Sequence, residues 1–189
     1  QFRDSGFWPV TEPPVFSQHG GTVPPGFALS ITSSVATAGQ TAQIYYTTDE
    51  SDPRRLGGGF HPSARLYTAP ILIPGVTTIK ARARNTSTAE WSPLTTATFA
   101  PGAVPASASN LVVAELMYHP PDTTAAERAA GYDNADDFEF ARLQNIGPTP
   151  IDLAGMRFTD GITFDFTASP VRYLGPGGNI LVVANLAAF

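Results

Sequence analysis

The chain has 189 residues, a length that suits two small domains. With 42% hydrophobic and 14% charged residues it holds enough apolar material for a core, which excludes wholesale disorder and collagen-like or coiled-coil architectures. The absence of cysteine excludes disulfides, Cys-ligated zinc, iron–sulfur clusters and thiol nucleophiles, and the net charge of −5 argues against nucleic-acid binding.

Residues 1–100 predict an antiparallel β-sandwich. Apolar and polar residues alternate in the segments 41–47 and 78–84, which is typical of strands with one buried face. Turn residues separate the predicted strands, and no helical period of useful length occurs. The shorter strands are expected at Phe27–Thr32, Ile71–Ile73 and Thr95–Phe99.

The most distinctive stretch is residues 44–54, where a strand runs into a turn. Asp49 and Asp52 can cap backbone N–H groups there, and Pro53 stops the strand. The alternative is a paired-carboxylate glycosidase site or a cation site that also uses Glu50. Glycosidase carboxylates work in a cleft at a defined separation, which a tight surface turn does not offer, so we favour the structural interpretation.

Residues 14–99 resemble the C-terminal Ig-like domain of chitobiases and β-hexosaminidases. The resemblance rests on YYTTDESDP at 45–53, in which Asp49, Asp52 and Pro53 are the motif residues, and on LYTAPI and TTIKARA further along. Glu50 stands where the pattern usually has glycine, so we expect a turn that avoids a positive φ at this position. In those enzymes the module is an accessory domain, so the resemblance implies a non-catalytic role.

Residues 101–109, PGAVPASAS, predict a linker because they are small, uncharged and rich in Pro, Ala and Ser. The charge balance changes at this segment. Residues 1–100 carry seven basic and six acidic side chains, whereas residues 110–189 carry four arginines against ten acids. The sequence therefore predicts two domains, at 1–100 and 110–189.

Residues 110–189 are also expected to form short strands. The continuous apolar run Ile180–Ala184 predicts a central strand that is buried on both faces. A single helix is expected at Thr124–Ala130, capped by Thr123 or Thr124 and ended by Gly131. The strands are expected at Leu111–Tyr118, Phe138–Asn145, Ile151–Leu153, Met156–Thr159, Ile162–Phe166 and Ile180–Asn185.

This second half resembles the bacterial lamin-tail domains found on large surface or secreted proteins. The blocks that carry the resemblance are LVVAELMYHPP at 111–121, DFEFARLQN at 137–145, IDLAGMRFTDG at 151–161 and LGPGGNILVVA at 174–184. Within these blocks the motif residues are Glu115, Tyr118, Glu139 and Asn145. The resemblance implies an Ig-like β-sandwich. Such a domain needs about 100 residues, so we expect this one to be C-terminally incomplete and poorly stable alone.

Two ligand sites can be considered from residue chemistry. Asp133, Asp136 and Asp137 offer the oxygen ligands that calcium prefers, but the EF-hand spacing is not met, and we favour a solvated polar insert. Trp8 and Trp91 could stack on sugar rings if they are exposed. Packing inside the fold is the favoured alternative for both rings, because tryptophan is usually largely buried.

The expected fold is therefore all-β, with two tandem Ig-like antiparallel β-sandwich domains. We expect non-catalytic structural or interaction modules of a larger secreted or cell-surface protein, whose partners are proteins, polysaccharides or other domains of the same parent chain. The alternative is a pair of carbohydrate-binding accessory modules of a polysaccharide-acting enzyme. No catalytic residue, cofactor (calcium apart), nucleic-acid partner or membrane span is expected. Because the chain opens with Gln1 rather than Met, we interpret it as a piece of a longer polypeptide without its leader.

Overall fold

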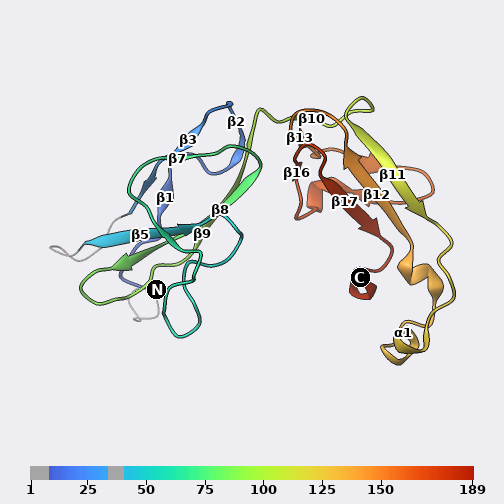
Figure 1. Cartoon of the computed structure of the whole chain (residues 1–189), viewed down its shortest axis with the longest axis horizontal. Helices are drawn as coiled ribbons and strands as arrows, with labels where there is room; N and C mark the ends of the chain where they lie inside the picture. The colour runs from blue at the N-terminus through green and yellow to red at the C-terminus, as the bar shows by residue number, and fades with distance from the viewer. Residues whose placement is uncertain (1–8, 34–40) are drawn as a thin grey trace. The chain divides into compact units, whose positions relative to one another are not determined.

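The computed structural model of the chain describes residues 9–33 and 41–189, and it is all-β, as the sequence predicted (Figure 1). The chain divides into two compact units, which we call unit 1 (Gln1–Gly102) and unit 2 (Ala103–Phe189). Each unit is built from small stacked sheets, consistent with the Ig-like β-sandwich class.

Unit 1 is organised around a five-stranded sheet with the order β2-β9-β8-β5-β6. Two small antiparallel pairs, β1–β4 and β3–β7, supply the other side of its core. The strands are β1 (Val15–Phe16), β2 (Gly21–Val23), β3 (Ala28–Leu29), β4 (Ile31–Thr32), β5 (Ala42–Thr47), β6 (Arg65–Leu66), β7 (Ile71–Leu72), β8 (Thr77–Asn85) and β9 (Thr95–Pro101).

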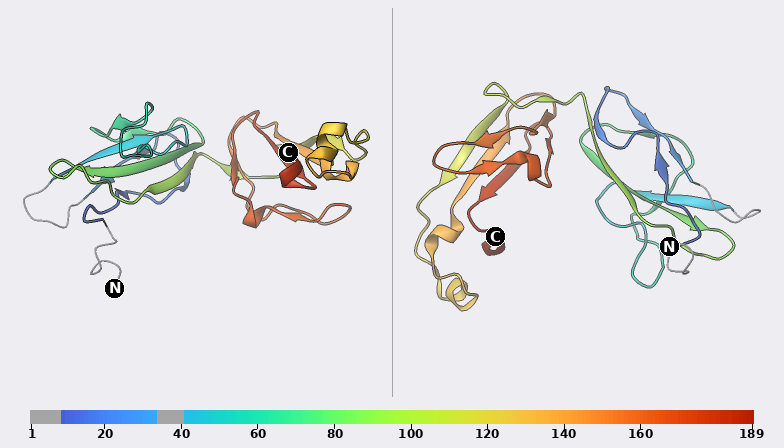
Figure 2. Two further views of the ribbon diagram at one scale, coloured as in Figure 1. Left: turned by 90° about the horizontal axis from the view of Figure 1, so that it is seen from below. Right: turned by 180° about the vertical axis from the view of Figure 1, so that it is seen from behind.

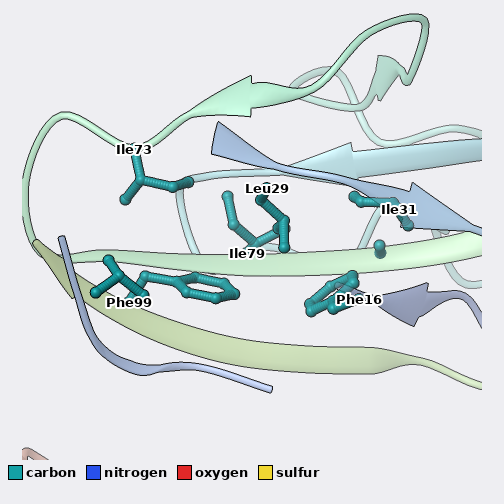
Figure 3. Close-up of a cluster of buried hydrophobic side chains, with 8 residues drawn as sticks. Phe16, Leu29, Ile31, Ile73, Ile79 and Phe99 are labelled. Atoms are coloured by element: carbon teal, nitrogen blue, oxygen red, sulfur yellow. The ribbon is translucent and has the colours of Figure 1, made fainter. Parts of the chain in front are cut away.

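The alternation that predicted β8 decides which of its faces is buried. Ile79 and the alanines that follow it at alternate positions are completely buried, whereas the intervening Lys80 and Arg82 are only half-buried. Figure 3 shows how Ile79 from β8 and Phe99 from β9 meet apolar side chains from the opposite strands. The core of unit 1 consists of Phe16, Val23, Leu29, Ile31, Ile73, Ile79, Ala81 and Phe99.

The pairs of unit 1 are antiparallel, as predicted, except that β2 runs parallel to β9, with Gly21 opposite Phe99. The approach to this pair requires a glycine. Gly20 has φ 81°, and a Cβ atom at this position would lie 2.7 Å from the carbonyl oxygen of Thr98. A parallel pair joins segments that are distant in sequence. Local sequence patterns therefore do not reveal it.

Unit 2 contains two three-stranded sheets, β11-β12-β17 and β10-β13-β16, and the hairpin β14–β15 (Figures 1 and 2). The pair β10–β13 is parallel and the other pairs are antiparallel. The strands are β10 (Val104–Pro105), β11 (Leu111–Met117), β12 (Phe140–Asn145), β13 (Ile151–Asp152), β14 (Arg157–Phe158), β15 (Phe164–Asp165), β16 (Tyr173–Leu174) and β17 (Asn179–Val183). The buried residues of its core are Leu111, Leu143, Ile151, Leu153, Phe166, Leu174 and Val182.

The apolar run near the C-terminus forms β17, but the prediction of a central strand is wrong. Within the described residues β17 pairs with β12 alone, so it is an edge strand. Val182 is buried on the inner face of the sheet, whereas Leu181 is 44% exposed on the outer face. A continuous apolar run therefore marks a strand here without marking burial on both faces.

The predicted helix is confirmed as α1 (Ala125–Ala129), which lies beyond the end of β11 in Figure 1. Thr124 caps it, because its hydroxyl accepts from the Glu127 N–H while the Glu127 carboxylate accepts from the Thr124 N–H. Of the helices that the structure describes, none has the length and apolar character needed to cross a bilayer. The short 3₁₀ turns are η1 (Ala135–Phe138), η2 (Phe166–Ala168) and η3 (Leu186–Ala188).

The segment 101–109, expected to be a linker, takes part in the sheets. Pro101 ends β9, and the Gly102 N–H donates to the Val23 carbonyl oxygen in unit 1. In unit 2, β10 pairs with β13, and the carboxamide oxygen of Asn110 accepts from the Ser107 N–H. Hydrogen bonds thus hold most of this segment in place, and it does not form a free spacer.

The expectation that the turn after β5 avoids a positive φ at Glu50 is wrong, because Glu50 has φ 62°. The left-handed conformation costs an ordinary residue roughly 1 kcal/mol. Glycine avoids this cost but loses more backbone entropy on folding, so the net gain is smaller. We expect Glu50→Gly to raise the free energy of unfolding by up to about 1 kcal/mol in urea denaturation. Thr48→Gly is the matched control and should lower it, since Thr48 has no positive φ. If both variants lowered the free energy of unfolding equally, backbone strain could not be assigned to position 50.

Candidate functional site

Asp52, from the distinctive turn of unit 1, binds an arginine of the neighbouring strand. Its two carboxylate oxygens accept from Arg82 Nε at 2.8 Å and Arg82 Nη2 at 2.7 Å, and Oδ1 also accepts from the Arg54 N–H at 2.9 Å. The third arginine nitrogen, Nη1, donates to the Ser92 carbonyl oxygen. This bidentate pair joins the turn to β8 and to the segment that precedes β9. The next residue, Pro53, is buried.

Asp49 closes the same turn locally. Its carboxylate accepts from the side-chain hydroxyl and the backbone N–H of Ser51. The hydrogen bonds of Ser51, and secondly of Ser63, lower the pKa of Asp49 to about 2. These hydrogen bonds favour the ionised carboxylate, which accepts hydrogen bonds and does not donate a proton. The arrangement is therefore that of a turn cap rather than of a general acid.

Acid should weaken unit 1 and unit 2 through such carboxylates. Burial raises the pKa of Asp52, but the hydrogen bonds of Arg82 and Arg54 outweigh it and the net shift is downward. In unit 2 the hydrogen bond from Arg172 lowers the pKa of Asp152. A lowered folded-state pKa contributes stability above the unfolded value of 3.8, and this stability is lost as the pH falls through the folded value.

We therefore expect the free energy of unfolding to fall as the pH is lowered from about 4 towards 2. Asp52→Asn and Asp152→Asn should each flatten this dependence in urea denaturation at a series of pH values. Asp160→Asn, which changes an exposed acid, is the control and should leave the slope as it is in the unaltered chain. An unchanged slope in all three variants would show that these pairs do not set the acid sensitivity.

Trp91 does not present a ring face to solvent. It is 6% exposed, its Nε1 donates to the Gly58 carbonyl oxygen at 2.8 Å, and its ring packs against Tyr45 and Phe60. The Arg84 guanidinium lies 5.8 Å from the Trp91 ring centroid, adding a cation–π contact. Packing, the favoured alternative from the sequence, is thus the role of Trp91. Trp8, the other candidate for stacking on a sugar, lies outside the described residues.

The three aspartates considered for calcium lie around η1 without converging. Asp133 and Asp136 are exposed, and Asp137 Oδ1 accepts from Asn185 Nδ2 at 3.2 Å. Asn134 caps the turn through the N–H of Asp136. Among the residues that the structure describes, no three His, Asp or Glu side chains are placed to hold a metal ion.

Glu115 and Asn145, two of the motif residues of unit 2, have different surroundings. Glu115 lies on the outer face of β11, where its carboxylate accepts from Arg142 Nε at 2.9 Å. Asn145 is completely buried. Its Nδ2 donates to the carbonyl oxygens of Thr149, Leu174 and Gly175, and its Oδ1 accepts from the Gly147 N–H. Asn145 therefore ties β12 to the turns on both sides of it.

Tyr118 and Glu139, the remaining motif residues, line a groove of about 530 Å³ in unit 2. The groove lies over the inner face of the sheet, where Leu116, Ala141 and Val182 are paired across three strands. Its lining is mostly apolar and contains one charged side chain, Glu139. The residues that line it are Leu116, Met117, Tyr118, Glu139, Phe140, Ala141, Gly161, Ile162, Thr163, Phe164, Val182, Val183 and Ala184.

This groove, which we call the unit 2 groove, is the best candidate for a binding site. Leu116 is 54% exposed although it belongs to the inner face of the sheet, so apolar surface is left uncovered there. Among the described residues, no nucleophile paired with a base lines it. Open apolar surface of this kind suits the binding of a partner. Sequence reasoning missed Ile162 and Phe164 as lining residues, because it placed them in a single continuous strand.

Comparison with known proteins supports the accessory character of unit 1. Residues 32–99 match the family model described as Fn3 associated, a domain that accompanies fibronectin-3 and Ig-like modules. The match runs from the end of β4 into β9, includes the turn with Asp49 and Asp52, and covers a little over a third of the chain. No curated protein matches the chain.

Proposed function

We propose that the chain is a pair of non-catalytic structural and interaction modules from a larger secreted or cell-surface protein. The observation that carries this proposal is that the carboxylates of the turn after β5 are both engaged in hydrogen bonds within unit 1. Asp52 is held by Arg82, and Asp49 accepts from Ser51. Both carboxylates are engaged in holding the turn, whereas glycosidic chemistry requires two acids that face each other across a cleft.

The family comparison and the two resemblances support the same role. The Fn3-associated match suggests an accessory module for residues 32–99, and it falls within the part that resembles the chitobiase C-terminal domain. The lamin-tail resemblance of residues 110–189 suggests a surface or secreted parent chain. The excess of acids in that half, ten against four arginines, disfavours binding to nucleic acid.

The proposal is tested against its carbohydrate-binding alternative with insoluble chitin and cellulose. We expect the protein to remain in the supernatant after centrifugation with either polymer, and to release no product from a chromogenic β-N-acetylglucosaminide. Retention that Trp8→Ala removes at an unchanged melting temperature would establish the alternative. Product release that Asp49→Asn or Asp52→Asn removes would establish an enzyme. Trp91→Ala is unsuitable here, because loss of a buried ring disturbs the fold.

A further inference from the structure

Edge strand β17 and the unit 2 groove lie side by side and offer complementary contacts. The Ala184 N–H donates to the Glu139 carbonyl oxygen, and the Gly178 carbonyl oxygen accepts from the Asn145 N–H. Because backbone groups alternate along an antiparallel ladder, the N–H and C=O of Leu181 and of its neighbours 179 and 183 point away from β12. Within the described residues no strand pairs with this edge.

The groove supplies the side-chain half of a strand-binding site. Its floor is the row Leu116, Ala141 and Val182, and its other wall contains Ile162 and Phe164. A strand added beside β17 would turn every second side chain towards this apolar space. Backbone bonds along the edge would give affinity, and the groove would select apolar residues at alternate positions.

A charged group at one end of the groove indicates which charge a bound segment would carry there. Glu139 directly precedes β12, and its carbonyl oxygen accepts from the Ala184 N–H at the end where β17 finishes. Its carboxylate has no hydrogen-bond or salt-bridge partner among the described residues, and no basic side chain lines the groove. An occupant with a cationic side chain at this end would complement it.

We propose that the unit 2 groove and the β17 edge bind an extended segment of a protein partner, added antiparallel to β17. The segment carries apolar residues at alternate positions and a lysine or arginine at its N-terminal end, beside Glu139. This proposal rests on the interaction role proposed above and names the chemistry of its partner. It uses β-strand addition, in which the open edge of a sheet acts as a template.

The test uses a fluorescent seven-residue peptide in which valine and threonine alternate after an N-terminal lysine. We expect saturable binding by fluorescence anisotropy, and weakening by about tenfold or more when glutamate replaces the lysine. A peptide methylated on the backbone nitrogens that face β17 should not bind, because it lacks the edge donors. Failure of the lysine peptide to bind, or equal binding of all three peptides, would overturn the proposal.

Variants of the protein locate the site. Glu139→Lys should weaken the lysine peptide by about tenfold and strengthen the glutamate peptide, whereas Asp122→Lys, with the same change of charge at an exposed loop residue, should do neither. Leu181→Pro should abolish binding, because it removes an outward N–H without breaking the ladder to β12. Val113→Pro is the matched control on the opposite edge strand, where the N–H also points outward, and should leave binding intact.

Circular dichroism and the melting temperature establish that each variant is folded before binding is compared. If Leu181→Pro does not fold, the Glu139→Lys charge exchange decides the question alone. Binding that is indifferent to both variants would place the peptide elsewhere and overturn the proposal. The two proposals fail separately: retention on chitin or product release would overturn the non-catalytic interaction role, whereas loss of peptide binding alone would overturn the strand-addition site.

Discussion

Asn145→Asp should destabilise unit 2 by about 3–5 kcal/mol at neutral pH, the cost of leaving a buried charge without a partner. The substitution keeps the shape of the side chain but replaces the donor Nδ2 with an oxygen. That oxygen would face the carbonyl groups of Thr149, Leu174 and Gly175, all acceptors, in a position with no exposure to solvent. A loss of this size is a large part of the about 5–15 kcal/mol that stabilises a typical domain.

The destabilisation caused by Asn145→Asp should be larger at neutral pH than in acid. Burial among carbonyl oxygens favours the protonated form of the introduced acid, so the destabilisation should shrink as the pH falls from neutral towards about 4 and stay small below that, where the unfolded chain is protonated as well. Hydrogen exchange read by mass spectrometry on peptides of β12 and β16 measures the loss. Asn134→Asp is the control, since aspartate caps a turn as well as asparagine does. Equal exchange in Asn145→Asp and the unaltered chain would contradict the role assigned to Asn145.

Phe99→Ala should destabilise unit 1 by about 3–5 kcal/mol, through the lost transfer free energy of the ring and the cavity that remains. Phe99 is completely buried (Figure 3). Its ring stacks on Phe27 at a centroid distance of 5.8 Å and lies 6.3 Å from Phe16. The ring therefore joins β9 to the strands on the other side of the core.

The comparison for Phe99→Ala is Phe60→Ala, the same chemical change at a ring that is 44% exposed. We expect Phe60→Ala to cost about 1 kcal/mol, because solvent can fill the space and fewer contacts are lost. Urea denaturation followed by circular dichroism measures both. Losses of similar size would show that burial does not distinguish the two rings.

The sequence predicted strands well where one face is buried and the other is not. In β8 the alternation of Ile79 and the alanines with basic residues predicted both the strand and its faces. The two-residue strands β1, β6 and β16 carry too few residues for any period, and they form because tertiary hydrogen bonds select them. The parallel partners of β2 and β10 were beyond local patterns for the same reason.

Two residues of the candidate site were singled out from the sequence as motif residues, but the groove itself was not predicted. Tyr118 and Glu139 were singled out through the lamin-tail resemblance, and the structure brings both to the unit 2 groove. Their apolar neighbours were not recognised, because a groove depends on which inner-face residues stay uncovered rather than on their identity. The partner of Asp52 was missed too. The alternation at 78–84 predicted one buried face but no partner for Arg82, and only the register of β5 against β8 places it beside the turn.

The parallel pairing of β2 with β9 constrains how unit 1 can assemble during synthesis. The segment that includes β2 leaves the ribosome before β9, whose partner residues Phe99, Ala100 and Pro101 follow nearly eighty positions later. Until they emerge, Val23 and Phe16 have no completed core to enter. The early apolar residues of nascent unit 1 therefore stay exposed until β9, its last strand, is synthesised. This lengthens the time during which they can associate with other chains.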